Sequence, residues 1–114
     1  MPIAAPLRRG NLFSPPAATS GGEAFESLLA GGTFRLERIV STGQATPPGE
    51  WYDQEADEWV VLLSGSATLR LAEPEETFDL APGDWVLLPA HRRHRVERTA
   101  ADVPTVWLAI HFRP

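Results

Sequence analysis

The sequence predicts an all-β sandwich or barrel with one short helix near its start. Three observations support this fold class. From residue 33 onward, short stretches rich in Val, Leu, Thr and aromatic residues recur at intervals near ten residues, bounded by turn-forming residues. Only one earlier stretch has helical spacing. The chain of 114 residues, 43% of them apolar, suits one domain around a single core.

The first elements in chain order are an arm and a helix. Residues 1–21 are rich in Pro, Ala, Gly and Ser, which predicts a tail or a loosely docked N-terminal arm. In residues 22–30, Phe25, Leu28 and Leu29 share one face at helical spacing, and acidic residues occupy the first turn. Gly31 and Gly32 would end this helix. We therefore expect an arm over 1–21 and a single domain over 22–114.

The remaining elements are expected to be strands. Each stretch is bounded by turn residues such as TPPG at 46–49, SGS at 64–66 and APG at 81–83. The predicted strands cover residues 33–40, 58–63, 67–71, 77–80, 84–88, 94–98 and 105–112.

Composition excludes several kinds of chemistry. The chain contains no cysteine, which excludes disulfides, thiolate nucleophiles and sulfur-ligated metals. It contains no lysine either, so a Schiff-base mechanism is excluded. The net charge of −5 argues against nucleic acid as a partner, and we interpret the arginine-rich run at 92–98 as a solvated strand face rather than a phosphate site.

The sequence also bears on location. No apolar run approaches the roughly 20 residues that a membrane span needs. The basic pair Arg8 and Arg9 is not followed by a hydrophobic stretch, so we expect no secretory signal. A cytoplasmic location without membrane contact is therefore expected.

Two segments carry a specific spacing. Glu58 is followed by six residues, WVVLLS, and then Gly65. Further on, Gly83 is followed by five residues, Pro89, one residue, His91, two residues and His94. Together these segments resemble the two motifs of the cupin superfamily, with His91 standing where the second motif has glycine. The resemblance covers residues 33 to 112 and implies a jelly-roll barrel, or double-stranded β-helix.

The resemblance also implies where two of these side chains lie. Strand alternation places Glu58 and Val60 on one face of their strand, and His94 and Val96 on one face of another. In a cupin barrel both faces point inward, so Glu58 and His94 are expected to converge inside. Glycine at positions 65 and 83 suits tight turns with positive φ.

The sequence departs from the family where the first motif has its His-x-His pair. Those two positions are occupied by Trp51 and Asp53, or by Tyr52 and Gln54, depending on the gap before Glu58. The metal set that the resemblance implies, three His and one Glu, is thereby reduced to Glu58 and His94. Asp53 or Gln54 are the candidate replacements, and His91 is a further candidate.

Other side chains are expected to complete the pocket. A carboxylate facing a barrel interior needs a partner, because an unpaired buried charge is costly. Without a metal, Arg38 and His111 are the expected partners of Glu58. Trp51 and Tyr52 are candidates for an apolar wall at the barrel mouth. The remaining tryptophans, Trp59, Trp85 and Trp107, are interpreted as packing residues.

These candidates lead to three functional hypotheses. Asp53, Glu58 and His94 would form an oxygen-rich metal set suited to Mn, Fe or Mg, with Zn also open, whereas His91, His94 and Glu58 would resemble a facial triad. The favoured hypothesis is a homodimeric barrel that binds a polar small molecule through Glu58 and His94, with any metal held weakly and no organic cofactor. The alternatives are a metal-dependent cupin enzyme, an oxygenase, isomerase or decarboxylase of a small organic acid, and a sensing module without chemistry.

Overall fold

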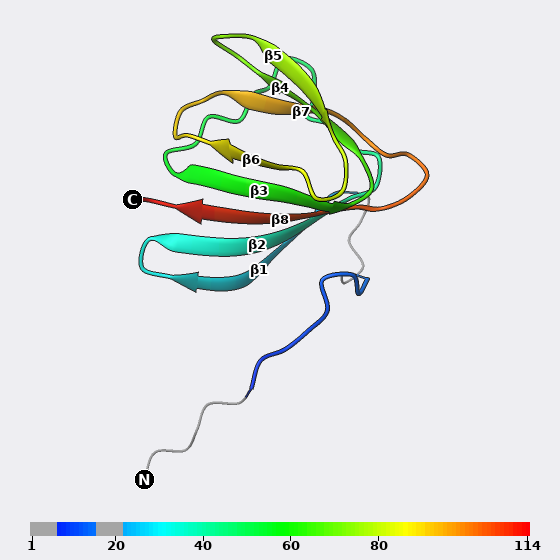
Figure 1. The fold of residues 1–114 in the computed structure, drawn as a ribbon, viewed down its shortest axis with the longest axis vertical. Coiled ribbons are helices and arrows are strands. Elements are labelled where there is room, and N and C mark those ends of the chain that lie inside the picture. The colour runs from blue at the N-terminus through cyan, green and yellow to red at the C-terminus, as the bar shows by residue number, and fades with distance from the viewer. Residues whose placement is uncertain (1–6, 16–21) are drawn as a thin grey trace.

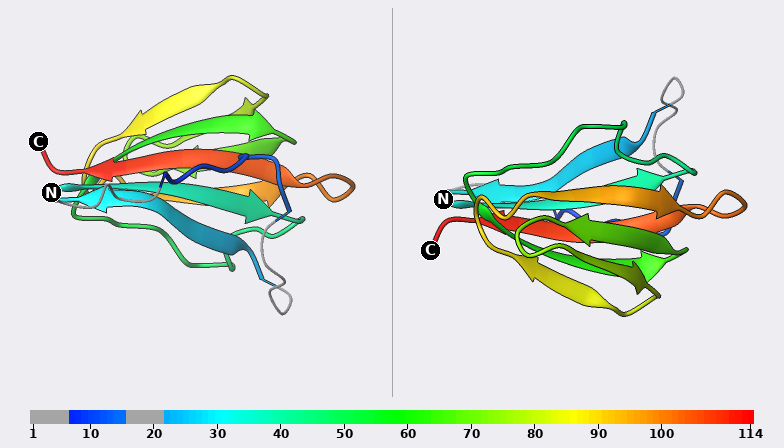
Figure 2. Two further views of the ribbon diagram at one scale, coloured as in Figure 1. Left: turned by 90° about the horizontal axis from the view of Figure 1, so that it is seen from below. Right: turned by 90° about the horizontal axis from the view of Figure 1, so that it is seen from above.

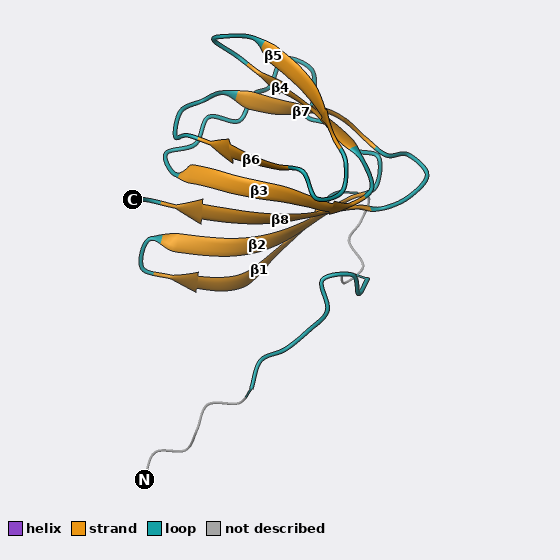
Figure 3. Cartoon of the chain, in the orientation of Figure 1, coloured by secondary structure: helices purple, strands orange, loops and turns teal. Residues whose placement is uncertain are grey.

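A computed structural model describes residues 7–15 and 22–114, and this part of the chain folds almost entirely into strands. Figure 3 shows strands and loops but no helix in the described residues. Accordingly, no helix long and apolar enough to cross a membrane occurs in these ranges. The eight strands are β1 (Ala24–Gly31), β2 (Phe34–Ser41), β3 (Asp57–Ser64), β4 (Ala67–Leu71), β5 (Glu76–Leu80), β6 (Trp85–Leu88), β7 (His94–Thr99) and β8 (Thr105–Phe112).

The strands form two antiparallel sheets that face each other (Figure 1). One sheet has five strands in the order β1-β2-β8-β3-β6, and the other has three in the order β5-β4-β7. The views in Figure 2 show the smaller sheet covering one part of the larger one, which leaves β1 at a free edge. This two-sheet barrel confirms the predicted all-β fold class.

The core lies between the two sheets and is built by strand alternation. Along β3 the buried residues are every second one, so that Val60 and Leu62 face inward. Leu62 and Ala109 of the larger sheet have no exposed surface, and Leu69 of the smaller sheet is 2% exposed. These side chains belong to one hydrophobic cluster, which holds the sheets together.

The predicted helix at 22–30 is wrong. Residues 24–31 form β1, which pairs antiparallel with β2 and contains an irregularity between Ser27 and Leu29. The acidic residues that suggested a first helical turn make cross-strand contacts instead: Glu23 with Ser41, and Glu26 with Arg38. Gly32, expected to end the helix, has a φ of 41° in the β1–β2 hairpin turn. Pairing with β2 therefore overrides the local helical spacing.

Part of the predicted N-terminal arm is described. Residues 7–15 lie against the outer face of β1 and β2, where the Arg8 guanidinium donates to the Leu28 carbonyl oxygen at 3.0 Å. Arg38 donates from β2 to the carbonyl oxygens of Leu12 and Ser14, at 3.3 and 2.7 Å. The rest of the arm, residues 1–6 and 16–21, falls outside the described residues. The division into an arm and one domain thus stays a prediction.

Candidate functional site

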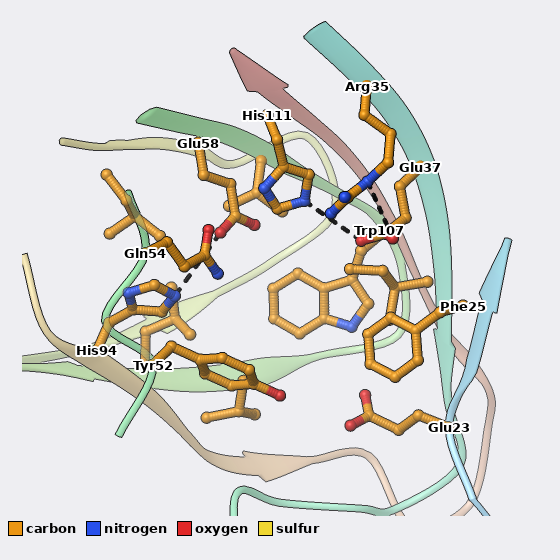
Figure 4. A pocket seen from close by; sticks show the side chains of 15 residues that line it. Glu23, Phe25, Arg35, Glu37, Tyr52, Gln54, Glu58, His94, Trp107 and His111 are labelled. Carbon is orange, nitrogen blue, oxygen red and sulfur yellow. Dashed lines mark hydrogen bonds and ion pairs between the residues drawn. The ribbon is translucent and has the colours of Figure 1, made fainter. Parts of the chain in front are cut away.

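A cavity of about 220 Å³ lies between the two sheets, and its lining mixes polar and apolar side chains (Figure 4). The lining comes from both sheets and from the segment that precedes β3. Its ionisable residues are Glu23, Arg35, Glu37, Tyr52, Glu58, His94 and His111. The apolar floor and walls include Val60, Leu69, Leu88 and Val96.

Three of the polar residues form one row across the larger sheet. Arg35 of β2 is paired with His111 of β8, and His111 is paired with Glu58 of β3. Residues directly opposite each other on neighbouring strands share a face of the sheet. All three therefore face the cavity, and Leu88 of β6, which is paired with Glu58, continues the row.

Glu58 and His94 approach each other across the cavity from opposite sheets. Both residues are 6% exposed, and Glu58 Oε1 lies 3.7 Å from His94 Nε2, which is beyond hydrogen-bond distance. Glu58 Oε1 is buried and makes no hydrogen bond to any described residue. An acceptor in this position has lost its water without gaining a protein donor, which is costly unless another group supplies one.

The position of the His94 ring is set by three contacts. His94 Nδ1 lies 3.1 Å from the Arg92 carbonyl oxygen, and the imidazole stacks on the Tyr52 ring with centroids 5.4 Å apart. The backbone of Tyr52 also pairs with that of His94 in an isolated bridge. Because a carbonyl oxygen only accepts, Nδ1 carries the proton in this contact, and Nε2 faces Glu58.

Two further carboxylates line the cavity, and each has partners in the protein. Glu37 accepts from His111 Nε2 at 3.3 Å and pairs with Arg35 Nε at 3.7 Å. Glu23 accepts from the Ser41 hydroxyl at 2.5 Å, and Ser41 Oγ accepts in turn from Trp107 Nε1 at 3.1 Å. These contacts hold the two carboxylates at the cavity wall.

Burial and the negative charges of these carboxylates affect the pKa of Tyr52. Burial raises the pKa of the Tyr52 phenol above its usual value of 10.0, and the negative charges of Glu23, Glu58 and Glu37 raise it further. The phenol is therefore a neutral hydrogen-bond donor at physiological pH. Figure 4 shows its ring beside His94, on the side of the cavity opposite Glu58.

Arg38, expected to be the partner of Glu58, lies on the other face of β2. Arg35 and Glu37 face the cavity along this strand, so Arg38 points outward. It is 6% exposed because Glu26 and the N-terminal arm cover it, and its guanidinium contacts Glu26 at 2.5 Å. The prediction of Arg38 as a pocket residue is therefore corrected.

Trp51, Asp53 and His91 also lie outside the cavity lining. Trp51 packs under three guanidinium groups whose carbons are 5.5 to 5.8 Å from its ring, those of Arg70, Arg93 and Arg95. Asp53 Oδ1 lies 2.8 Å from His91 Nδ1, in a pair whose side chains are 51% and 66% exposed. Gln54 and Tyr52, the alternating positions of the same segment, do line the cavity.

Five polar or aromatic residues of the lining are absent from the sequence-based prediction: Glu23, Phe25, Arg35, Glu37 and Trp107. The first two fell in the predicted helix. The other three lie on predicted strands, but placing Arg38 in the pocket assigned Arg35 and Glu37 to the opposite face of their strand. Trp107 is four residues before His111 on β8, so alternation places both on one face. That periodicity was the signal that could have found Trp107.

A family model described as a cupin domain matches residues 37–111, about two thirds of the chain. The chain belongs to the cupin family. The family's second motif now has a structural explanation at its one departure: His91, in the place of the motif glycine, has a φ of 63°, a conformation that glycine adopts more readily. No curated protein matches the sequence.

Solved structures resemble this cupin along nearly its whole length. A Ralstonia eutropha JMP134 protein named as a candidate mannose-6-phosphate isomerase is 45% identical, with a TM-score of 0.88 over 94% of this chain and 99% of its own. A cupin superfamily protein from Desulfitobacterium hafniense DCB-2 is 18% identical, with a TM-score of 0.74 over 96% and 94%. The polyketide cyclase RemF from Streptomyces resistomycificus is 18% identical, with a TM-score of 0.72 over 93% and 79%. The last two show the fold alone.

The described residues of this cupin do not fit the family's metal centre. Nowhere in the ranges 7–15 and 22–114 do three or more His, Cys, Asp or Glu side chains come together as metal ligands. Glu58 and His94 approach each other, but Asp53 pairs with His91 outside the cavity. Zinc sites use at least three protein ligands, and the facial triad needs three as well. The geometry brings together only two of the side chains named for the metal.

Proposed function

We propose that this cupin binds a polar small molecule in its barrel, through Glu58 and His94. The observation that carries the proposal is the buried Glu58 Oε1, which faces the 220 Å³ cavity without a hydrogen bond to any described residue. A ligand that donates a hydrogen bond to this oxygen would remove the cost of leaving a buried acceptor unsatisfied. The cavity also has the character of a ligand site, with apolar walls and a few convergent polar groups.

The neighbouring groups support this role. His94 Nε2 lies 3.7 Å from Glu58 Oε1 and offers a ligand a second atom for hydrogen bonding. Tyr52 and Trp107 supply apolar contact, the part that we had expected from Tyr52 and Trp51. Gln54 and His111 are further polar groups in the lining, within reach of different parts of a ligand.

The experiment is a fragment screen by two-dimensional ¹H–¹⁵N NMR with matched variants. We expect Glu58→Ala and His94→Ala each to abolish binding of any fragment that shifts cavity residues. Asp53→Ala and His91→Ala are the controls, because they remove the same chemical groups from the exposed pair outside the cavity. Binding that survives both cavity substitutions would contradict the proposal.

The metal-dependent enzyme remains the alternative, and it has a separate test. If present, a divalent ion would contact Glu58 and His94, the pair inside the cavity, and with two protein ligands it would be held weakly. We therefore expect a chelator to leave ligand binding almost unchanged. Elemental analysis of untagged protein that finds close to one tightly held Mn, Fe or Zn per chain, together with loss of activity on chelation, would favour the enzyme.

A second candidate comes from the Ralstonia relative, whose name suggests isomerisation of a phosphorylated sugar. Identity of 45% over nearly the whole chain is the observation in its favour. Against it stands the cavity lining, where Arg35 is the one guanidinium and already pairs with Glu37. Phosphate sites generally use several cationic or N–H donors. Conversion of mannose 6-phosphate to fructose 6-phosphate by the purified protein would establish this candidate.

Homodimer formation and a cytoplasmic location also stay proposals. Support for the dimer comes from β1, an edge strand, and from large apolar side chains exposed there and at the start of β2, namely Phe25, Leu29 and Phe34. An exposed apolar edge of this kind is often covered by a second copy.

A further inference from the structure

The cavity has a clear excess of negative charge. Three carboxylates line it, those of Glu23, Glu37 and Glu58, whereas Arg35 is its one guanidinium. Arg35 is 51% exposed as a side chain and pairs with Glu37, so it is turned to the rim and partly neutralised. The raised pKa of Tyr52 agrees with this, because after burial its main causes are these same carboxylates. In a partly buried site such a field favours cations and repels anions.

Two polar atoms face each other inside the cavity. Glu58 Oε1 is buried with no donor among the described residues, and His94 Nε2 lies 3.7 Å from it, beyond hydrogen-bond distance, while Nδ1 faces the Arg92 carbonyl. With the proton on Nδ1, Nε2 of an uncharged ring is an acceptor like Glu58 Oε1, and two acceptors cannot bond directly. A single group with two or more N–H bonds could donate to both, and a primary ammonium, with three, meets this requirement where a hydroxyl, with one, does not.

The surroundings of this pair fit the rest of such a ligand. The rings of Tyr52 and Trp107 line the cavity near Glu58 and His94, and Phe25 lies farther along it, beyond Trp107 (Figure 4). Aromatic faces attract cations and cover apolar groups. Val60 and Leu88 continue the apolar wall behind Glu58.

We infer that the ligand of this cavity is a small primary amine in its protonated form, with an apolar or aromatic body. Its ammonium group donates to Glu58 Oε1 and to His94 Nε2, and its body lies against Tyr52 and Trp107. This inference rests on the proposed function of the cavity and adds the chemical class of the ligand.

Three probes of one shape test the inference: benzylamine, benzyl alcohol and benzoate, which carry a cation, a neutral hydroxyl and an anion. Binding is followed in the ¹H–¹⁵N spectrum through the four Trp indole N–H signals, at pH 7 with a chelator present to keep metals out. Trp107 lines the cavity and the other three tryptophans do not, so they serve as internal controls. We expect benzylamine to shift the Trp107 signal with at least about tenfold tighter binding than benzyl alcohol, and benzoate to leave it unchanged.

The isosteric Glu58→Gln variant tests the residue that sets the selectivity. It should weaken benzylamine binding about tenfold to hundredfold and remove the preference over benzyl alcohol. Asp53→Asn, outside the cavity, should bind like the unmodified protein. If Glu58→Gln does not fold, His94→Phe keeps a ring against Tyr52 and removes Nε2, and should weaken benzylamine in the same way.

The outcomes separate the two proposals. If benzoate shifts Trp107 as strongly as benzylamine does, or if the preference for the amine survives Glu58→Gln, the cavity binds ligands but the amine inference is wrong. If none of the three probes shifts the Trp107 signal, the inference is wrong, and if the fragment screen also yields no cavity binder, the proposed function fails with it.

Discussion

Replacing Gly65 by alanine tests how the turn between β3 and β4 is built. Gly65 has a φ of 85°, and a Cβ placed on it would lie 2.4 Å from Thr105 Oγ1, 2.6 Å from Thr105 Cα and 2.8 Å from the Pro104 carbonyl oxygen. Two of these atoms belong to the backbone, so rotation of a side chain cannot relieve the contact. Thr105 is fully buried at the start of β8, and its hydroxyl also contacts Ser66.

The expected loss of stability has two parts. The left-handed backbone costs a non-glycine residue about 1–2 kcal/mol. Forcing an extra methyl group into a packed site costs about 1–3 kcal/mol more. Gly65→Ala should therefore lower the free energy of unfolding by about 2–5 kcal/mol, a large share of the roughly 5–15 kcal/mol that stabilises a typical domain.

Gly83→Ala is the matched control. Gly83 has a φ of 94°, but a Cβ there would meet nothing within 4 Å. Only the backbone cost applies, so the expected loss is about 1–2 kcal/mol. Urea unfolding of both variants, followed by tryptophan fluorescence, gives the comparison. Equal losses for the two variants, or a smaller loss for Gly65→Ala, would refute the argument from close approach.

Three further predictions address the site, the core and the assembly. Tyr52 is the only tyrosine, so absorbance at 295 nm follows the ionisation of its phenol alone. The pH midpoint of this titration should lie above 10.0 in the folded protein, and Glu23→Gln should lower the midpoint slightly. The unfolded chain loses the Tyr52 phenolic proton at a lower pH than the folded protein does, so the free energy of unfolding should fall as the pH rises above 10. The fall should be smaller in Tyr52→Phe. A titration midpoint at or below 10 in the folded protein would contradict the argument. Leu62→Ala, at a position with no exposed surface, should lower the free energy of unfolding by about 2–5 kcal/mol, measured by urea unfolding. A loss of less than about 1 kcal/mol would contradict the place of Leu62 in the core. Light scattering after size exclusion should give the mass of a dimer, twice 12.5 kDa, and a monomer at micromolar concentration would exclude it.

The strands after residue 33 and two residues of the candidate site could be predicted from the sequence alone. The strands at 67–71 and 105–112 were predicted with the observed bounds, because strand-forming apolar residues are concentrated there between clear turn residues. The resemblance to cupins, carried by the spacings around Glu58 and His94, implied that both side chains face the barrel interior, and the structure places both in the cavity lining. Gly65 and Gly83 were predicted in turns with positive φ, which they have. In each case the information lies within a few neighbouring residues.

Features that depend on contacts between distant segments could be known only from the folded chain. Residues 24–31 have helical spacing, yet they form β1 because β2 offers a strand to pair with, and no local pattern shows that partner. Arg38 is one residue away from Glu37, which lines the cavity, but a shift of one residue reverses the face. That face was set by the pairing of β2 with β8, about seventy residues further along the chain. The charge of the cavity follows from the same pairing, because it places Glu37 and Arg35 beside His111, and so it could be known only once the sheets were assembled.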